Sequence, residues 1–79
     1  MIEILTTKFF DNWLMTLKDR AAKIRIQTRI SRIAFSGNFG AVKTIGQGVY
    51  EIRIDYGPGY RIYYLKLKKV VIVLLCGGD

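Results

Sequence analysis

The sequence contains no histidine, and it has a single cysteine and a single proline among 79 residues. Without histidine, it lacks the side chain that most often acts as a general acid or base near neutral pH. One cysteine excludes an internal disulfide, and we expect Cys76, between apolar residues and glycines, to be a small buried hydrophobe. Since carboxylates at ligand spacing are also missing, the sequence predicts no metal and no other cofactor.

Long apolar segments are missing as well. The longest, VVIVLLC at residues 70–76, is far shorter than the ~20 residues that a membrane-spanning helix needs. The N-terminus, MIEILTTKFF, lacks the basic start and apolar core of a signal peptide. The sequence therefore predicts a soluble cytoplasmic protein without a membrane partner, and its length predicts one domain over residues 1–79.

Positive charge is what the chain has in excess. Thirteen Lys and Arg against six Asp and Glu give a formal net charge of +7. Such a surface favours a polyanion, namely nucleic acid, or an acidic protein partner. The plainer alternative is a basic surface that serves solubility alone. Hydrophobic residues make up 51% of the chain, which is enough for a core and argues against disorder.

The N-terminal third predicts a strand and a helix. Residues 2–5 are mostly apolar and indicate a short strand, after which Thr6 or Thr7 can cap a helix. Five apolar residues between positions 9 and 17, three of them aromatic, then recur at helical spacing. This aromatic cluster is interpreted as a helix packing on a sheet rather than as a ligand platform.

A second helix follows Asp19, which is expected to be its cap. One apolar stripe runs along it, formed by Ala22, Ile26, Ile30 and Ile33. A parallel stripe on its flank is formed by Arg25, Arg29 and Arg32. This arginine stripe is either a ridge that contacts phosphates or a solvated helix edge, and because no glutamate interrupts it we weigh both interpretations equally.

The remainder of the chain predicts strands. The loop SGNFG ends the second helix, and AVKTI, VYEIRIDY, YRIYYLKL and VVIVLLC follow as strand patterns. The last of these is apolar on both faces, as a covered central strand would be. The order of elements predicts an α+β fold, in which an N-terminal strand and a two-helix layer pack on a small antiparallel sheet.

These motifs together resemble a known family. The segment GVYEIRIDYGPGYRIYY, with GNFGAVKTIGQ before it and VVIVLLCGGD after it, resembles the RelE/ParE superfamily of bacterial toxins, and most nearly its phage-derived, HigB-like addiction-module killer proteins. The segment FFDNWLMTLKDRAAKIRIQTRISRI resembles the helical pair of that branch, so the likeness covers nearly the whole chain.

The resemblance implies a RelE-like fold and the toxin of a type II toxin–antitoxin system. Such a toxin is a ribonuclease that cuts mRNA in the ribosomal A site and is inhibited by a cognate antitoxin, so mRNA, ribosomal RNA and the antitoxin are the implied partners. ParE relatives share the fold but inhibit DNA gyrase, which is the first alternative. Family members usually continue past GGD into a final helix. A tail-less member that only binds its antitoxin is therefore the second alternative.

The predicted catalytic residues lie on the strands around the GPG turn. If that turn sets ordinary pairing, Arg53 and Arg61 share one face of a hairpin and can clamp a phosphate. The resemblance implies that Arg61 binds the scissile phosphate and stabilises the transition state. Lys43 matches a recurrent family lysine that would orient or deprotonate the attacking hydroxyl. Glu51 is either a general base or, as we favour, a salt-bridge partner of Arg53.

The predicted RNA-binding residues complete the site. The arginine stripe of the second helix would bind ribosomal RNA. Tyr63 falls on the Arg61 face, where it would either stack on a nucleobase or be an ordinary half-buried strand tyrosine.

Overall fold

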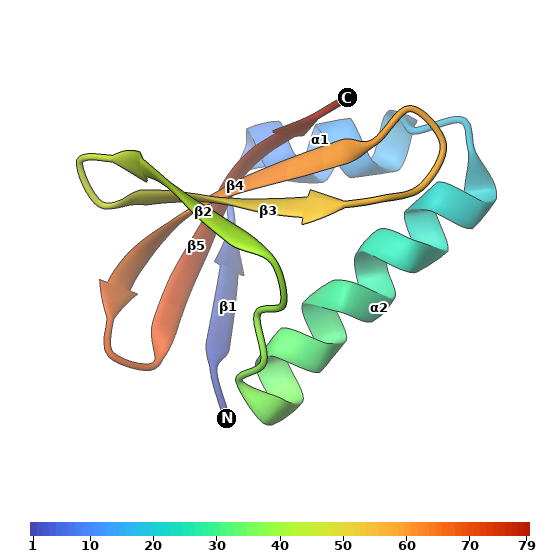
Figure 1. The fold of residues 1–79 in the computed structure, drawn as a ribbon. Helices are drawn as coiled ribbons and strands as arrows, with labels where there is room; N and C mark the ends of the chain where they lie inside the picture. Colours follow the sequence, from blue (N-terminus) through green and yellow to red (C-terminus); the bar gives the residue numbers. More distant parts are fainter.

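The computed structural model describes residues 1–79 as two helices and a five-stranded sheet (Figure 1). The elements in chain order are β1 (Glu3–Thr6), α1 (Lys8–Thr16), α2 (Arg20–Ser36), β2 (Val42–Gly46), β3 (Val49–Ile54), β4 (Tyr60–Lys68) and β5 (Val71–Gly78). This order of strand, two helices and four strands confirms the predicted α+β fold.

The sheet is mixed. Its strand order is β1-β5-β4-β3-β2, and every neighbouring pair is antiparallel except β1 and β5, which run parallel. The predicted antiparallel sheet is confirmed for β2 to β5, whereas β1, predicted to lie in the layer with the helices, is an edge strand of the sheet and runs parallel to β5. A parallel neighbour needs a long crossover between the two strands, and here both helices and the other three strands separate β1 from β5 in sequence.

Both helices begin where the sequence predicts. Thr7 caps α1 by accepting a hydrogen bond from the Phe10 amide at 3.1 Å, and its hydroxyl also donates to the carbonyl of Leu75 on β5. Asp19 caps α2 by accepting from the Ala22 amide at 3.1 Å. Because the cap of α1 is bonded to β5, it fixes the helix to the sheet as well as starting it.

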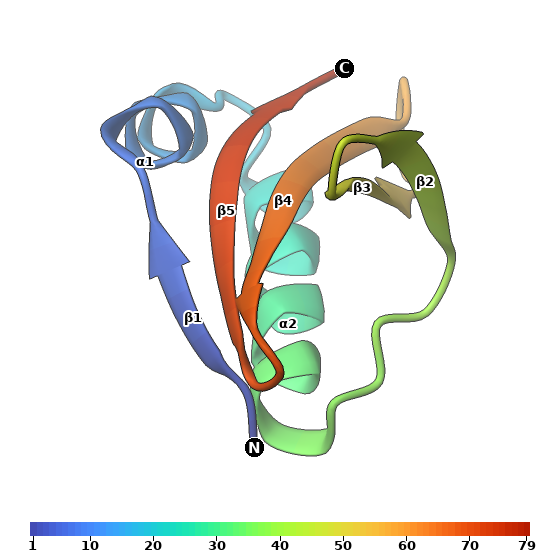
Figure 2. The ribbon, with the colours of Figure 1, turned by 90° about the vertical axis from the view of Figure 1, so that its left-hand side faces the viewer.

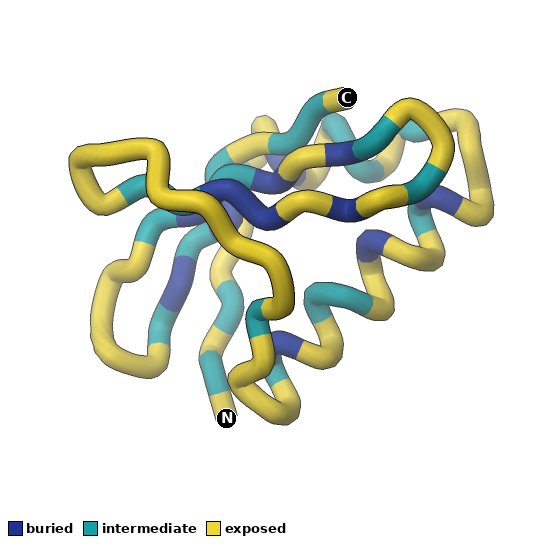
Figure 3. Tube along the Cα trace, viewed as in Figure 1, coloured by how far each residue is buried: buried dark blue, intermediate teal, exposed yellow.

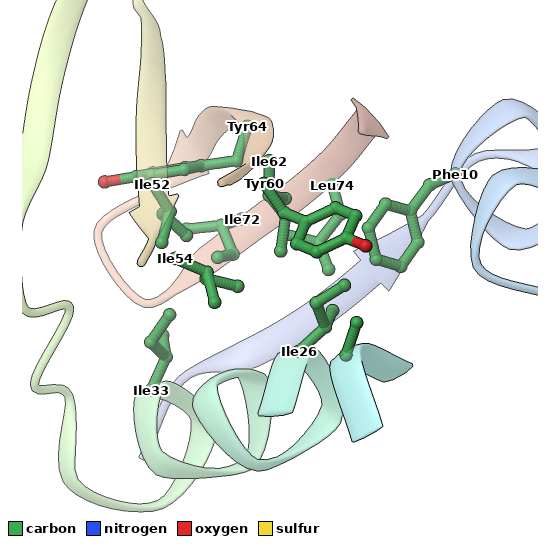
Figure 4. Packing of buried hydrophobic residues seen from close by; sticks show 11 residues of the cluster. Phe10, Ile26, Ile33, Ile52, Ile54, Tyr60, Ile62, Tyr64, Ile72 and Leu74 are labelled. Carbon is green, nitrogen blue, oxygen red and sulfur yellow. The ribbon is translucent and has the colours of Figure 1, made fainter. Parts of the chain in front are cut away.

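The core lies between α2 and one face of the sheet (Figure 4). Ala22, Ile26 and Ile33 of α2 are fully buried, and Ile30 packs against the same cluster at its margin. The sheet contributes its fully or almost fully buried side chains, which are Ile52, Ile54, Tyr60, Ile62, Tyr64, Ile72 and Leu74. Each buried Ile or Leu stabilises the fold by roughly 1.5–3 kcal/mol relative to an exposed position.

The opposite face of the sheet, called the open face below, has no helix over its middle. In Figure 2, α2 lies behind β4 and β5, and this face is turned to the viewer. Strand β5 alternates between buried Ile72 and Leu74 and half-buried Val71, Val73 and Leu75. The prediction that β5 is covered on both faces is wrong, because side chains that point away from α2 meet only their neighbours on the sheet.

One further prediction fails on the open face. Cys76 is exposed rather than buried, since it lies on β5 opposite Tyr63 on the open face. In α1, the interpretation of the aromatic cluster as a helix packing on the sheet is confirmed for two of its three rings. Phe10 is buried and Trp13 packs on the sheet, with its ring 6.3 Å from that of Tyr60, whereas Phe9 is 77% exposed. Figure 3 shows the exposed segments at the outer turns and on β2.

No helix is both long and apolar enough to cross a membrane.

Candidate functional site

The pairing of β3 with β4 places the two predicted arginines side by side. Arg53 and Arg61 are direct partners in the register of this hairpin, and the row continues to Gly78 on β5. The parallel row nearest to them contains Lys43 of β2, Glu51 of β3, Tyr63 of β4 and Cys76 of β5. Because side chains alternate along a strand, both rows point to the open face, away from α2. Four candidate catalytic residues and Tyr63 are thus brought onto one surface.

Glu51 lies between the two arginines. Its Oε1 is 3.8 Å from Nε of Arg53, and its Oε2 is 3.9 Å from Nε of Arg61. The Glu51 side chain is 9% exposed, whereas those of Arg53 and Arg61 are 53% and 48% exposed. Each carboxylate oxygen thus faces one guanidinium, which offsets the repulsion between two like charges directly opposite each other. The Nη groups are not used by these contacts and are available to an anion.

A pocket opens beside these arginines at the end of the hairpin. It has a volume of about 460 Å³ and is lined by residues 53–61 together with Asp79. The turn that forms its rim needs glycine, since Gly57 and Gly59 have φ angles of 58° and 85°, in the left-handed region. Both Asp55 and Asp79 line the pocket as well. An anion in it therefore has Arg53 and Arg61 as cationic partners, while the aspartates restrict where it can lie.

Lys43 and Tyr63 lie next to this site and differ in how far their side chains are exposed. Lys43 is exposed on β2, an edge strand of which every residue is exposed. Its Cα pairs with that of Glu51, so its side chain starts one row away from Arg53. Tyr63 is half-buried on β4, with its Cα opposite that of Glu51. The exposed Lys43 side chain is free to change its rotamer, and Tyr63 offers part of a ring face.

The three arginines of the stripe on α2, which are Arg25, Arg29 and Arg32, have three different environments. Arg25 is exposed and its guanidinium lies over the ring of Tyr56, 4.5 Å from the centroid. Arg32 is exposed on the helix surface. A second cleft of about 290 Å³ is lined by these arginines together with Asp55. Arg25 and Arg32 therefore present positive charge next to the hairpin pocket, with which the second cleft shares Ile54 and Asp55.

Arg29 points inward instead, which its predicted role in RNA binding does not anticipate. Its Nε and Nη2 donate to the carbonyl of Phe39 at 3.1 and 2.9 Å, and its Nη1 donates to the carbonyl of Arg53 at 3.1 Å. Burial lowers the pKa of Arg29, and the charge of Arg32 lowers it further, while Asp55 acts in the opposite direction. Neither helical spacing nor residue type distinguishes Arg29 from its neighbours in the sequence.

Sequence reasoning also missed three side chains of the pocket. Tyr56, which alternation had assigned to the strand, lies in the turn and is fixed there by Arg25. Asp55 and Asp79 line the wall of the pocket. The position of Asp55 directly after a strand and before GPG was the available signal, whereas Asp79 reaches the pocket only because β5 pairs with β4.

A comparison with known proteins gives one relative in sequence. No family model matches the chain. An uncharacterized protein of Haemophilus influenzae is 50% identical over 78 residues, which cover 99% of this chain and 78% of that protein. The aligned region extends over nearly the whole fold.

Two solved structures share the fold. The intact Escherichia coli RelBE toxin–antitoxin complex contains a chain that matches with a TM-score of 0.81 and 18% identity, over 100% of this chain and 96% of that one. The isolated E. coli RelE toxin matches with a TM-score of 0.79 and 18% identity, over 100% of this chain and 84% of that one. The chain belongs to the same protein family as the H. influenzae protein, and its fold is that of the RelE toxin.

Proposed function

We propose that this protein is the toxin of a toxin–antitoxin pair and that it inhibits translation by cutting mRNA on the ribosome, without a metal ion. The observation that carries the proposal is the direct pairing of Arg53 with Arg61 beside a pocket of about 460 Å³. The fold shared with the E. coli RelE toxin supports the same function. The likeness to the HigB-like branch remains a proposal from sequence motifs.

The chemistry needs few groups. The 2′-oxygen of a ribose attacks the adjacent phosphorus, the bond from phosphorus to the 5′-oxygen breaks, and the products are a 2′,3′-cyclic phosphate and a 5′-hydroxyl. A proton leaves the 2′-hydroxyl and another reaches the departing oxygen, so no cofactor is consumed. Negative charge grows on the phosphoryl oxygens in the transition state, where two guanidinium groups provide bidentate, permanently charged donors. Arg53 and Arg61 would bind these oxygens through their free Nη groups.

Lys43 and Glu51 would have separate tasks. The Lys43 side chain, on the exposed edge strand, would orient the attacking hydroxyl as an ammonium or receive its proton as a neutral amine. The Glu51 carboxylate is nearly buried and faces both arginines, which supports a role in spacing them over a role as general base. Lysine and glutamate are less suited than histidine to act as a general acid or base near neutral pH. We therefore expect cleavage to depend on the ribosome for positioning the substrate. Tyr63 would offer its half-buried ring to a base beside the scissile phosphate.

The basic surfaces suggest the partners. Arg25 and Arg32 would contact ribosomal RNA in the cytoplasm, since they are exposed next to the hairpin pocket. The neighbouring RelBE structure is a complex with an antitoxin, and we propose a corresponding antitoxin for this chain. Its binding segment would be acidic or amphipathic, because the chain carries a formal net charge of +7.

The test is primer extension on an mRNA during in vitro translation with the purified protein added. We expect cuts that require ribosomes and disappear in Arg61→Ala, because this variant removes one of the two phosphate ligands. Lys69→Ala is the matched control: it removes one positive charge in the turn between β4 and β5, outside the pocket. Persistent cleavage by Arg61→Ala would remove Arg61 from the mechanism.

Two other outcomes would identify the alternatives. DNA damage on expression, with mRNA intact, would indicate a ParE-like inhibitor of DNA gyrase. Harmless expression together with co-purification of the antitoxin would indicate a protein that only binds its antitoxin. Expression of the chain in a host without the antitoxin therefore accompanies the cleavage assay.

A further inference from the structure

Arg29 connects three segments that are distant in sequence. It lies on α2, and its guanidinium donates to the carbonyls of Phe39 and Ala41 in the loop before β2 and of Arg53 on β3. The distances from these oxygens to its nitrogens range from 2.9 to 3.4 Å. All three nitrogens of the planar fork are engaged with backbone carbonyls.

The position of this contact in the sheet explains its importance. The β2–β3 ladder begins with Val42 opposite Ile52, and beyond it only one long bond of 3.4 Å joins the Arg53 amide to the Ala41 carbonyl. Arg29 bridges the carbonyls of Ala41 and Arg53 at this end. It therefore extends the connection between β2 and β3 past the last regular pair.

Strand β2 has little else to hold it. It is an edge strand, all of its residues are exposed, and its register with β3 shifts between Thr44 and Gly46. Since it buries no side chain in the core, its place depends on hydrogen bonds to β3, on the short turn that joins it to β3, and on the loop that precedes it. Lys43 is carried on this strand, with its Cα opposite that of Glu51.

The loop is shaped around the guanidinium. Gly40 has a φ of 70°, and a Cβ atom added there would lie 2.5 Å from Nη2 of Arg29. The Gly40 amide donates to Oδ1 of Asn38 at 3.0 Å, which holds the turn in this shape. Gly40 thus permits the close approach that lets Arg29 reach the carbonyls on either side of it.

We infer that Arg29 is a positioning residue of the cleavage site: it holds the start of β2 to the end of β3, so that Lys43 and Arg53 stand at fixed places beside Arg61. The inference rests on the proposed function for its effect on cleavage, while the connection between strands is a property of the fold. Arg29 acts through the backbone and does not itself contact RNA. Its positive charge matters less than the planar fork, which serves three carbonyls at once.

The variant Arg29→Lys separates these roles because it keeps the charge. An ammonium is a point donor and cannot span the three carbonyls, so we expect kcat for ribosome-bound mRNA to fall by about tenfold to a hundredfold with KM nearly unchanged. A phosphate ligand would instead tolerate lysine and show a change in KM and in salt dependence when replaced by glutamine. Arg20→Lys, at the exposed first residue of α2 and outside both pockets, is the matched control and should behave as the wild type.

A second measurement tests the connection without using activity. Amide hydrogen exchange of residues 42–46 should quicken by about tenfold in Arg29→Lys, while the central amides of β4 keep their protection. The Nε–Hε signal of Arg53 in an NMR spectrum should shift or broaden in the same variant. Unchanged exchange in β2 together with an unchanged Arg53 signal would overturn the inference, whatever the protein does to mRNA. If the wild type cuts no mRNA, the proposed function fails, and exchange and the Arg53 signal alone decide whether Arg29 fixes β2 and Arg53.

Discussion

The two faces of one sheet carry opposite kinds of side chain. Along β3, Ile52 is fully buried under α2, while Arg53, the next residue, has a side chain that is 53% exposed. Along β4, Ile62 is fully buried and its neighbour Arg61 is 48% exposed at the side chain. Because side chains alternate along a β-strand, residues that are adjacent in sequence point to opposite faces, one into the core and the other toward water.

This difference assigns stability to one face and chemistry to the other. The face under α2 buries apolar and aromatic side chains and accounts for most of the core. The open face holds a cluster of charge in which only Glu51 is nearly removed from water. Substitutions of neighbouring residues should therefore have separable effects, which the predictions below test from the largest expected effect on folding to the smallest.

The largest effect is expected from Ile62→Ala on the buried face. Removing most of a fully buried side chain should lower the free energy of unfolding by about 2–5 kcal/mol, measured by urea denaturation. Its control is the adjacent Arg61→Gln, which should change stability by less than about 1 kcal/mol because the Arg61 side chain is half exposed and Glu51 keeps its contact with Arg53. Similar losses in both variants would show that the two faces do not divide stability from chemistry.

A smaller loss is expected where α1 meets the sheet. A Cβ atom added at Gly77 would overlap the ring of Trp13, whereas at Gly78 it would meet nothing within 4 Å. Gly77→Ala should therefore cost about 1–3 kcal/mol of stability, because the indole ring has to move from its contact with β5. Gly78→Ala, the matched control, should leave stability within about 1 kcal/mol of the wild type. Equal melting temperatures for both variants would contradict this packing.

The burial of Tyr64 should also make the stability of the protein depend on pH in the alkaline range. Burial raises the pKa of Tyr64 above its ordinary value, and the neighbouring Tyr50 raises it further. The folded protein thus holds this proton more tightly than the unfolded chain. Its contribution to stability is complete below the unfolded pKa of about 10 and is lost as the pH rises through the higher folded value. In Tyr64→Phe, the decline in unfolding free energy between neutral and strongly alkaline pH should be shallower. An unchanged pH profile would exclude this contribution.

Sequence alone could predict the parts of the fold that follow from local patterns. Strand alternation and the GPG turn predict that Arg53 and Arg61 share one face of the hairpin, which is confirmed, and the register of the structure makes them direct partners. The caps at Thr7 and Asp19 are equally local. The roles of these arginines in catalysis remain predictions.

What the sequence could not predict depends on contacts between distant segments. Helical spacing gives Arg25, Arg29 and Arg32 the same flank, and only the path of the loop around Gly40 turns Arg29 inward. The exposure of Cys76 likewise depends on which face of β5 receives a helix. Patterns of one residue type describe a surface, but the tertiary neighbours decide which of its members are free.

Glu51→Gln should have the smallest effect on stability but should change how the open face binds an anion. The carboxylate of Glu51 lies 3.8 and 3.9 Å from the two arginines and competes with any anion that approaches them. Neutralising it should tighten the binding of inorganic phosphate by about fivefold, the size of one charge interaction near 4 Å in water. The unfolding free energy should change by less than about 1 kcal/mol.

Phosphate titration, followed at the arginine Nε–Hε signals, measures the change in phosphate affinity, and Asp11→Asn on α1 controls for net charge. An equal gain in both variants would exclude local competition. Tighter phosphate binding with abolished cleavage would make Glu51 the general base and reassign the only buried charge of this face from spacing to proton transfer.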